Sequence, residues 1–171
     1  MLSERLQSEL NEQIKHELFS AYYYLAMAAY LDNEGLEGFA NFFKVQAEEE
    51  KFHAMKIYNF INEKGGRVLF QAIEQPENQF ESIIDTFKKS LEHEQFVTKR
   101  IYYLMELAIE EKEHATISFL NWFVDEQVEE ENLMETHIQK LARVGEEGPG
   151  IIMLDTELAQ RTFVPPAEGE A

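Results

Sequence analysis

Residues 16–19 read His-Glu-Leu-Phe and residues 93–96 read His-Glu-Gln-Phe, so the two stretches are separated by 93 − 16 = 77 positions. The same offset relates three further pairs without a gap: Glu50 and Gln127, His53 and Glu130, and Phe42 and Phe119. Self-similarity at a fixed spacing indicates a structural unit that occurs twice. The sequence therefore predicts a helical hairpin written twice, with its two copies related by a pseudo-twofold axis.

Long stretches with few helix breakers surround these residues, and apolar side chains recur in them at every third or fourth position. This is the period of an amphipathic helix. It predicts four long helices, over about 3–31, 38–64, 80–110 and 115–143, and a short fifth helix over 151–158. No stretch alternates over a length that would indicate a strand, so we expect an all-α fold.

The connections between these helices predict the topology. The turn at 32–35 and the link near 110–114 are short, which favours antiparallel neighbours within each hairpin. The link over 65–79 has 79 − 65 + 1 = 15 residues and can reach at most roughly 50 Å. A helix of 27 residues is roughly 40 Å long. We therefore expect a four-helix bundle with one long crossover after the second helix.

Composition and charge exclude several classes of protein. The 171 residues include 44% hydrophobic ones, which excludes a disordered chain, and 15 basic against 33 acidic side chains give a net charge of −18. Such a charge repels nucleic acid and suits cations. The absence of cysteine excludes disulfides, thiolate zinc sites, Cys-ligated iron–sulfur clusters and a cysteine nucleophile.

The chain is expected to form a single domain that does not enter a membrane. No apolar run approaches the roughly 18 residues of a membrane span, and the first ten residues lack the apolar region of a signal peptide. We expect a cytoplasmic protein with its bundle over 1–145, a short helix over 146–160 and a C-terminal tail over 161–171.

Each long helix carries polar residues inside its apolar stripe, near its middle. They are Glu17 in the first helix, Glu50 and His53 in the second, Glu94 in the third, and Gln127 and Glu130 in the fourth. Buried carboxylates are costly unless they are paired or bind metal, and no Lys or Arg lies on these stripes. Carboxylates with one imidazole and an amide suit iron, manganese or zinc.

A single acidic residue on an imperfect stripe is usually solvated at a helix edge, and a lone Glu-x-x-His motif often arises by chance. The inner polar residues together do indicate a metal site, because the repeat with its offset of 77 relates their positions in the two hairpins. The histidines outside this set are not expected to bind metal. His16 and His93 flank the inner stripe, and we expect His114 and His137 at the surface or at an interface.

The pattern resembles the ferritin family, in particular the non-haem ferritins of bacteria and archaea, over nearly the whole chain. The resemblance implies a di-iron ferroxidase centre inside the bundle. The residues implied for the first iron are Glu17, Glu50 and His53, and those for the second are Glu94 and Glu130 with Glu50 bridging. Gln127 and Tyr24 match residues that the family keeps beside the centre. Glu49, Glu126 and Glu129, together with Glu130, match a third iron site.

The resemblance also implies a function. Fe(II) would be oxidised by O₂ or H₂O₂ and stored as an Fe(III) mineral inside a 24-subunit cage of identical chains. Two alternatives stay open at this point. One is a di-metal oxidase or peroxidase that works as a dimer and stores nothing. The other is a structural or binding bundle whose inner carboxylates lie at helix edges.

The sequence lacks features of several related families, which favours a non-haem ferritin over those families. Residues 127–130 read Gln-Val-Glu-Glu, so the second Glu-x-x-His motif of bacterioferritins and rubrerythrins is absent. Neither Lys51 nor Phe52 can be the methionine that binds haem in bacterioferritins, so no haem is expected. The chain has no cysteine for a rubrerythrin iron domain. Ligands within one subunit argue against the DNA-protecting mini-ferritins, which place their site between subunits.

Overall fold

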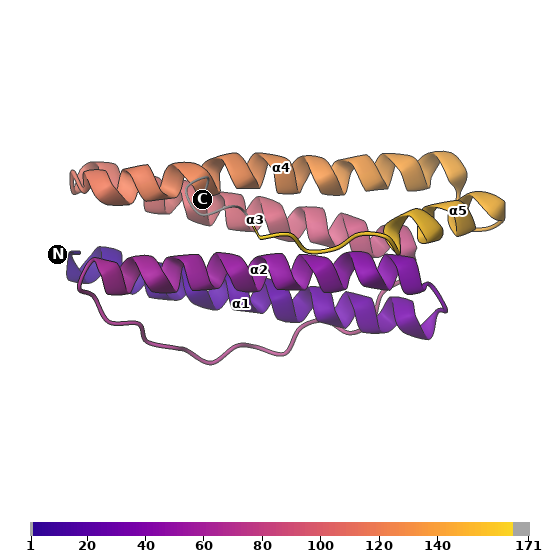
Figure 1. The fold of residues 1–171 in the computed structure, drawn as a ribbon, viewed down its shortest axis with the longest axis horizontal. Coiled ribbons are helices and arrows are strands. Elements are labelled where there is room, and N and C mark those ends of the chain that lie inside the picture. The colour runs from indigo at the N-terminus through magenta and orange to yellow at the C-terminus, as the bar shows by residue number, and fades with distance from the viewer. Residues whose placement is uncertain (1, 166–171) are drawn as a thin grey trace.

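The computed structural model describes residues 2–165, and they form a bundle of helices without any strand (Figure 1). The helices are α1 (Glu4–Asn33), α2 (Glu37–Glu63), α3 (Ile83–Glu110), α4 (His114–Val144) and α5 (Pro149–Leu158). The expected all-α fold with four long helices and a short fifth one is confirmed. In the part of the chain that is described, no helix is both long and apolar enough to cross a membrane.

The helix starts follow local capping chemistry. The hydroxyl of Ser3 accepts a hydrogen bond from the backbone N–H of Leu6, and that of Ser82 accepts one from Asp85. Because Ser82 supplies this cap, α3 begins at Ile83 and not at Phe80. Without these caps, the backbone N–H groups of Leu6 and Asp85 would lack a hydrogen-bond partner in the helix.

The long connection between α2 and α3 runs the length of the bundle, as Figure 1 shows. Its residues contact α1 at successive positions. The side chain of Asn11 bonds the backbone of Arg67 and Leu69, and Lys15 forms an ion pair with Glu74 at 2.9 Å. The predicted crossover is thereby confirmed, and it brings α3 back to the end of the bundle at which α1 ends.

The interior consists of two hydrophobic clusters with a polar belt between them. One cluster contains the aromatic side chains Phe39, Phe42, Phe43 and Phe87, and the other contains Leu6, Leu10, Ile57 and Phe123. The six inner polar residues of the sequence analysis are all buried between the two. The bundle therefore has no continuous apolar core at its middle, and this is where the candidate site lies.

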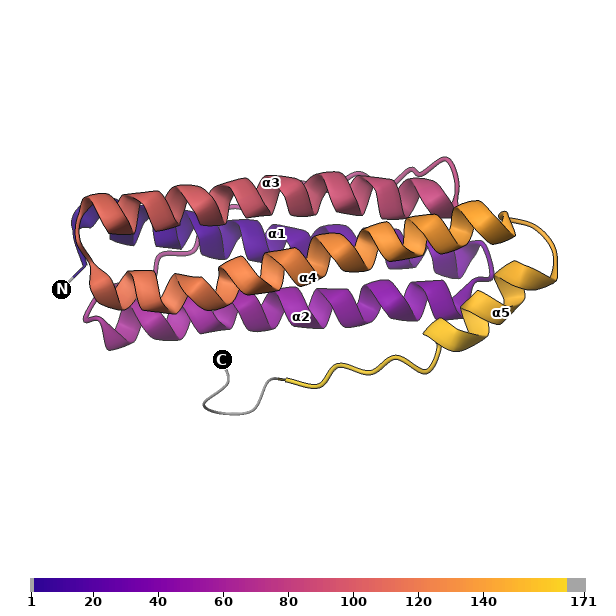
Figure 2. The same cartoon turned by 90° about the horizontal axis from the view of Figure 1, so that it is seen from above.

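Helix α5 docks on the start of α2 (Figure 2). The Oδ1 atom of Asp155 accepts hydrogen bonds from the backbone N–H groups of Gly38 and Phe39, at 2.9 and 3.0 Å. Since Leu36, the N-cap residue of α2, makes no side-chain hydrogen bond, Asp155 replaces that cap from another helix. A Cβ atom at Gly38 would lie 1.7 Å from the carbonyl oxygen of Asp155, so only glycine permits this approach.

The chain after α5 returns along α2 (Figure 2). Residues 161–165 belong to the expected tail, yet Arg161 bonds three acceptors on α2, and the ring of Phe163 lies 6.2 Å from that of Phe52. Residues 166–171 of that tail lie outside the described part of the chain.

The expectation for His137 is wrong. Its ring is buried, with its centroid 4.8 Å from that of Phe42 and 5.4 Å from that of Phe87. The reason is helical spacing, because His137 lies three residues after Met134 and four before Leu141, on the buried face of α4. His114, by contrast, is exposed at the start of α4.

Candidate metal centre

The polar belt gathers side chains from all four long helices. Glu17 comes from α1, Glu50 and His53 from α2, Glu94 from α3, and Gln127 and Glu130 from α4. The four helices contribute near their middles because the two hairpins carry matching polar positions. All six residues that the inner stripes predicted are thus brought to one level of the bundle and buried.

The residues predicted for the first metal lie close together. Glu17, Glu50 and His53 offer ligand atoms that are all within 4.8 Å of one another. The Nδ1 atom of His53 lies 3.6 Å from Glu50 Oε2 and 3.9 Å from Glu17 Oε2. That Glu17 oxygen is buried without a hydrogen-bond partner, whereas its Oε1 accepts a bond from Gln13 at 2.9 Å. A buried carboxylate oxygen of this kind is a good position for a cation.

A second group shares the same imidazole. His53, Glu126 and Glu130 also offer atoms within 4.8 Å of one another, and His53 Nε2 lies 3.8 Å from Glu126 Oε1. Both ring nitrogens of His53 therefore face carboxylates. The second set implied by the resemblance shares only Glu130 with this group, because it contains Glu94 and the bridging Glu50 in place of His53 and Glu126.

Glu94 accepts hydrogen bonds on both of its oxygens. Its Oε1 accepts one from the hydroxyl of Tyr24, and its Oε2 accepts one from Gln127 Nε2 at 3.0 Å. The same amide nitrogen donates to Thr98 Oγ1 at 3.2 Å. Tyr24 and Gln127, which the resemblance placed beside the centre, thus hold Glu94 in position.

Two buried glutamines belong to the belt and were missed by the sequence reasoning. Gln13 donates to Glu17, and Gln46 Nε2 donates to Glu130 Oε2 at 2.7 Å. Each lies four residues before an inner carboxylate of its own helix, Glu17 or Glu50. This spacing on the buried face was the available signal.

Burial shifts the acid–base properties of the belt. Loss of water around the carboxylates raises the pKa of Glu94 to about 7 and that of Glu130 to about 8. Burial also raises the pKa of Glu50 well above its usual value. For His53, burial lowers the pKa, but its carboxylate neighbours outweigh this and the pKa is raised. The belt therefore retains protons near neutral pH that a bound cation would displace.

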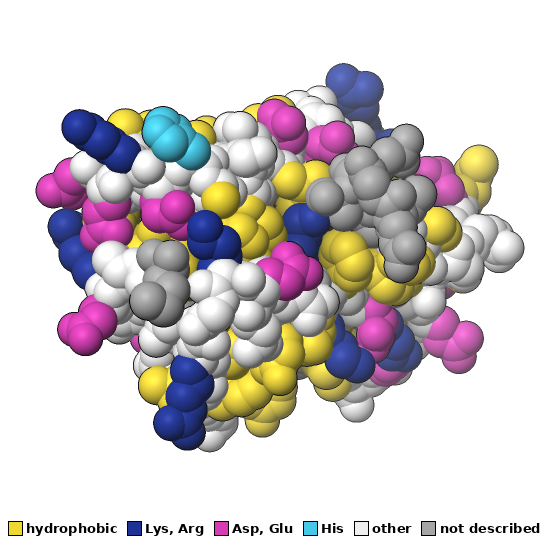
Figure 3. Space-filling view, turned by 60° about the vertical axis from the view of Figure 1, so that its left-hand side comes forward, with side chains coloured by type: hydrophobic (Ala, Val, Ile, Leu, Met, Phe, Trp, Pro, Cys, Tyr) yellow, Lys and Arg dark blue, Asp and Glu magenta, His cyan; other side chains and the backbone are white. Residues whose placement is uncertain are grey.

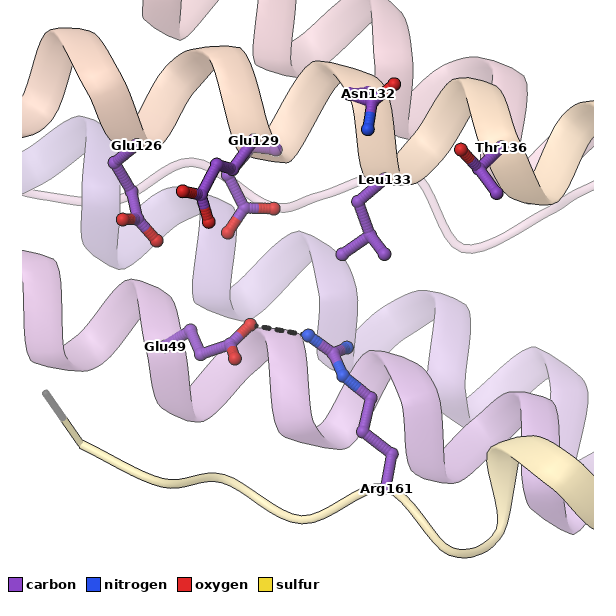
Figure 4. A pocket seen from close by; sticks show the side chains of 8 residues that line it. Glu49, Glu126, Glu129, Asn132, Leu133, Thr136 and Arg161 are labelled. Carbon is purple, nitrogen blue, oxygen red and sulfur yellow. Dashed lines mark hydrogen bonds and ion pairs between the residues drawn. The ribbon is translucent and has the colours of Figure 1, made fainter.

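Beside Glu130 lies an acidic pocket of about 520 Å³ between α2 and α4 (Figure 4). Its lining residues are Glu49, Glu126, Glu129, Glu130, Asn132, Leu133, Thr136 and Arg161. The residues predicted for a third iron thus share one pocket. Its one basic lining residue, Arg161, lies 2.9 Å from Glu49 Oε2, the contact drawn as a dashed line in Figure 4.

The repeat-related histidines outside the belt make other contacts. His93 Nε2 lies 2.7 Å from the hydroxyl of Ser20, and His16 Nε2 lies 3.8 Å from Glu12. Neither is part of a side-chain group within residues 2–165 that could hold a metal ion. Burial lowers the pKa of His93 to about 4, so this ring is neutral at physiological pH.

Residues 7–144 match the family model of the ferritin-like domain, and the chain belongs to the ferritin family. The particular relatives are bacterial non-heme ferritins. That of Staphylococcus aureus (strain USA300) is 54% identical over 163 residues, covering 95% of this chain and 98% of the relative. That of Staphylococcus epidermidis is 52% identical with the same coverage.

Solved structures agree with this assignment. A closed form of the Archaeoglobus fulgidus ferritin, engineered by site-directed mutagenesis, superposes with a TM-score of 0.94 at 46% identity. That alignment covers 96% of this chain and 100% of the other. A structure described as a novel open pore ferritin from the same archaeon gives a TM-score of 0.92 at 46% identity, covering 94% and 98%.

Proposed function

We propose that this protein oxidises Fe(II) at the buried polar belt and stores the product as a hydrous Fe(III) oxide inside a shell made of its own copies. The observation that carries this proposal is the cluster of Glu17, Glu50 and His53, with ligand atoms within 4.8 Å of one another inside the bundle. Membership in the ferritin family and the similarity to bacterial non-heme ferritins support it. The proposed location is the cytoplasm.

Each ligand has a proposed role. Glu17, Glu50 and His53 hold one Fe(II), while Glu94 and Glu130 hold a second, with Glu50 bridging. Electrons pass from the iron pair to O₂ or H₂O₂, water supplies oxygen for the oxide, and the protons leave to solvent. Carboxylates attract a trivalent ion more strongly than a divalent one, so this ligand set favours the oxidised product. No haem takes part.

Rotation of two side chains would complete the second iron position. Glu94 is held by Tyr24 and Gln127, and Glu130 by Gln46. Breaking such a bond leaves a buried donor without a partner at a cost of about 1–3 kcal/mol, which the new bond from the carboxyl group to the metal must outweigh. Tyr24 and Gln127 thus act as positioning residues that hold Glu94 near the iron pair.

The third site is proposed for the acidic pocket, where Glu49, Glu126 and Glu129 join Glu130. Its test is the double variant Glu49→Ala/Glu129→Ala. We expect it to bind the first two irons per subunit as the parent does, and to change the iron-to-oxygen ratio or the later kinetics. Loss of the first two irons as well would contradict this division of the sites.

We propose a shell of 24 subunits, for which the expected mass is 24 × 20.0 = 480 kDa, against 2 × 20.0 = 40 kDa for a dimer. Hydrophobic side chains gather in patches between charged groups on the face drawn in Figure 3, which suits contacts between copies. Large hydrophobic side chains that are about half or more exposed include Leu69, Phe70, Ile109, Ile152 and Met153.

The decisive experiment combines light scattering with an aerobic Fe(II) titration. A particle near 480 kDa that takes up many irons per subunit into a mineral supports storage. A stable dimer that oxidises iron and retains no mineral would favour the di-metal oxidase. Absence of stoichiometric iron binding would favour the purely structural bundle.

A further inference from the structure

Arg161 is anchored on one face of α2. Its guanidinium donates to the backbone carbonyl of Phe42 at 3.2 Å, to Gln46 Oε1 at 2.5 Å and to Glu49 Oε2 at 2.9 Å. These acceptors stand at positions i, i+4 and i+7 of the helix, which a planar fork of five donors can span. The guanidinium carbon also lies 4.5 Å from the centroid of the Phe42 ring.

The backbone of this arginine is held independently. The side-chain amide of Asn41 donates to the carbonyl oxygens of Leu158 and Arg161, at 3.0 and 2.9 Å. The residue therefore enters the acidic pocket from a segment that is fixed at the end of α5. Figure 4 shows the guanidinium pointing from this segment toward Glu49.

The arginine places a positive charge where a metal would bind. Among the described residues that line the pocket, it is the one cationic group beside Glu49, Glu126, Glu129 and Glu130. A cation bound to Glu49 would either share this carboxylate with the guanidinium or displace it. Both cases cost free energy, because like charges a few ångströms apart in a half-buried pocket repel.

The arginine also reaches the buried belt through one amide. Because it donates to the oxygen of Gln46, the nitrogen of that amide must point the other way, where it donates to Glu130 Oε2 at 2.7 Å. An amide side chain has one acceptor end and one donor end. Arg161 thus determines which end of Gln46 faces Glu130, a residue shared by the two metal-binding regions.

We propose that Arg161 is a resident cation of the third iron site, which competes with iron for Glu49 and orients Glu130 through Gln46. This inference rests on the third site proposed above. Its consequence is that iron binds there weakly and leaves readily, as suits a station between the buried pair and the mineral. Arg161 is a positioning residue, since it acts on the ligands and not on the metal.

The test measures metal binding without oxidation. The assembled protein is freed of iron and titrated with Zn²⁺, which is redox-inert and accepts carboxylate and imidazole ligands, in a calorimeter. We expect Arg161→Ala to tighten the weakest class of zinc sites by about tenfold or more, because a competing charge is lost. The tighter sites should stay within about twofold of the parent. Arg161→Lys should keep the weak binding, since it keeps the charge.

The matched control is Lys140→Ala. It also removes one cation and one contact of the C-terminal region, the ion pair between Lys140 and Glu157 at 3.0 Å that joins α4 to α5. Lys140 does not line the acidic pocket. We therefore expect its zinc affinities to equal those of the parent, whatever its effect on the unfolding temperature.

A structural clamp would give the opposite result. If Arg161 only fixes the chain end, Arg161→Ala lowers the unfolding temperature and leaves the weak zinc class unchanged or weaker, and the inference is overturned. The variant Glu129→Gln distinguishes a purely structural role of Arg161 from the absence of a third metal site in the pocket. If it abolishes the weak class, the third site stands and only the role of Arg161 is in question. If the weak class persists, or if no variant shows it, the third site and the inference both fall.

Discussion

Metal loading of the polar belt should release protons in a pH-dependent amount, because two of its carboxyl groups hold protons near neutrality. The pKa is about 7 for Glu94 and about 8 for Glu130. A metal ligand must be deprotonated, so each proton still bound before loading is released when the cation arrives. The perturbation is a change of pH from about 6.5 to about 8.5 during titration with Zn²⁺.

The magnitude follows from these two pKa values. At about pH 6.5 Glu130 is protonated in about 0.97 of the molecules and Glu94 in about 0.76, so the pair releases about 1.7 protons per subunit. At about pH 8.5 the fractions are about 0.24 and about 0.03, and the release falls to about 0.3. Glu50 and His53, whose pKa values are also raised, add to the release at the lower pH.

Calorimetry in buffers of different ionisation enthalpy measures this release directly. Glu130→Gln should remove about one proton from the value at about pH 6.5, because it deletes the group with the higher pKa of the pair. Glu135→Gln, the same substitution at an exposed position of α4, is the control and should change nothing. Equal proton release at both pH values, or a release near zero at the lower one, would refute this account of the belt.

Four further predictions concern activity and stability. Glu50→Ala should reduce rapid Fe(II) oxidation in stopped flow to near background. His53→Ala should slow the oxidation less, because this variant empties one iron position and not both. If Glu50→Ala oxidised two irons at the parent rate, that result would contradict the proposed bridging role of Glu50. The iron-free protein should lose thermal stability as pH rises from about 5 to about 8, because its carboxyl groups with raised pKa bind more protons folded than unfolded in that window; a flat profile would show that the shifts are absent. Gly38→Ala should lower the free energy of unfolding by about 2 kcal/mol or more, because its Cβ would collide with the backbone of Asp155. Asp155→Ala should cost about 1 kcal/mol through loss of the helix cap, and thermal or urea unfolding checks both values.

Much of the fold could be predicted from local patterns. The spacing of apolar residues located all five helices to within a few residues, because a helix repeats its buried face every 3.6 residues whatever it packs against. The link after α2 was long enough to run the full length of the bundle, which favoured a crossover. The start of α3 was misplaced by three residues, since the cap at Ser82 is a stronger signal than the apolar Phe80.

For the candidate site, the sequence could predict which residues lie on the buried face of each helix. Glu17, Glu50 and His53 lie on buried faces by their spacing alone, and the structure brings their ligand atoms within 4.8 Å. The spacing of His137 also places it on the buried face of α4, and its ring packs against Phe42 and Phe87 and not at the surface. Gln13 and Gln46 could have been predicted in the same way, because each lies four residues before an inner carboxylate on the same helix face.

The sequence by itself determined which residues point inward on each helix, since backbone periodicity is a local property. Only the tertiary structure decided which of them meet. Glu126 approaches His53 while Glu94 turns to Tyr24 and Gln127, a choice made by the packing of long, flexible side chains from different helices. Arg161 shows the same limit most clearly. It lies in a segment without any period, and its position beside Glu49 depends on the docking of α5 against α2, a contact between residues 112 positions apart.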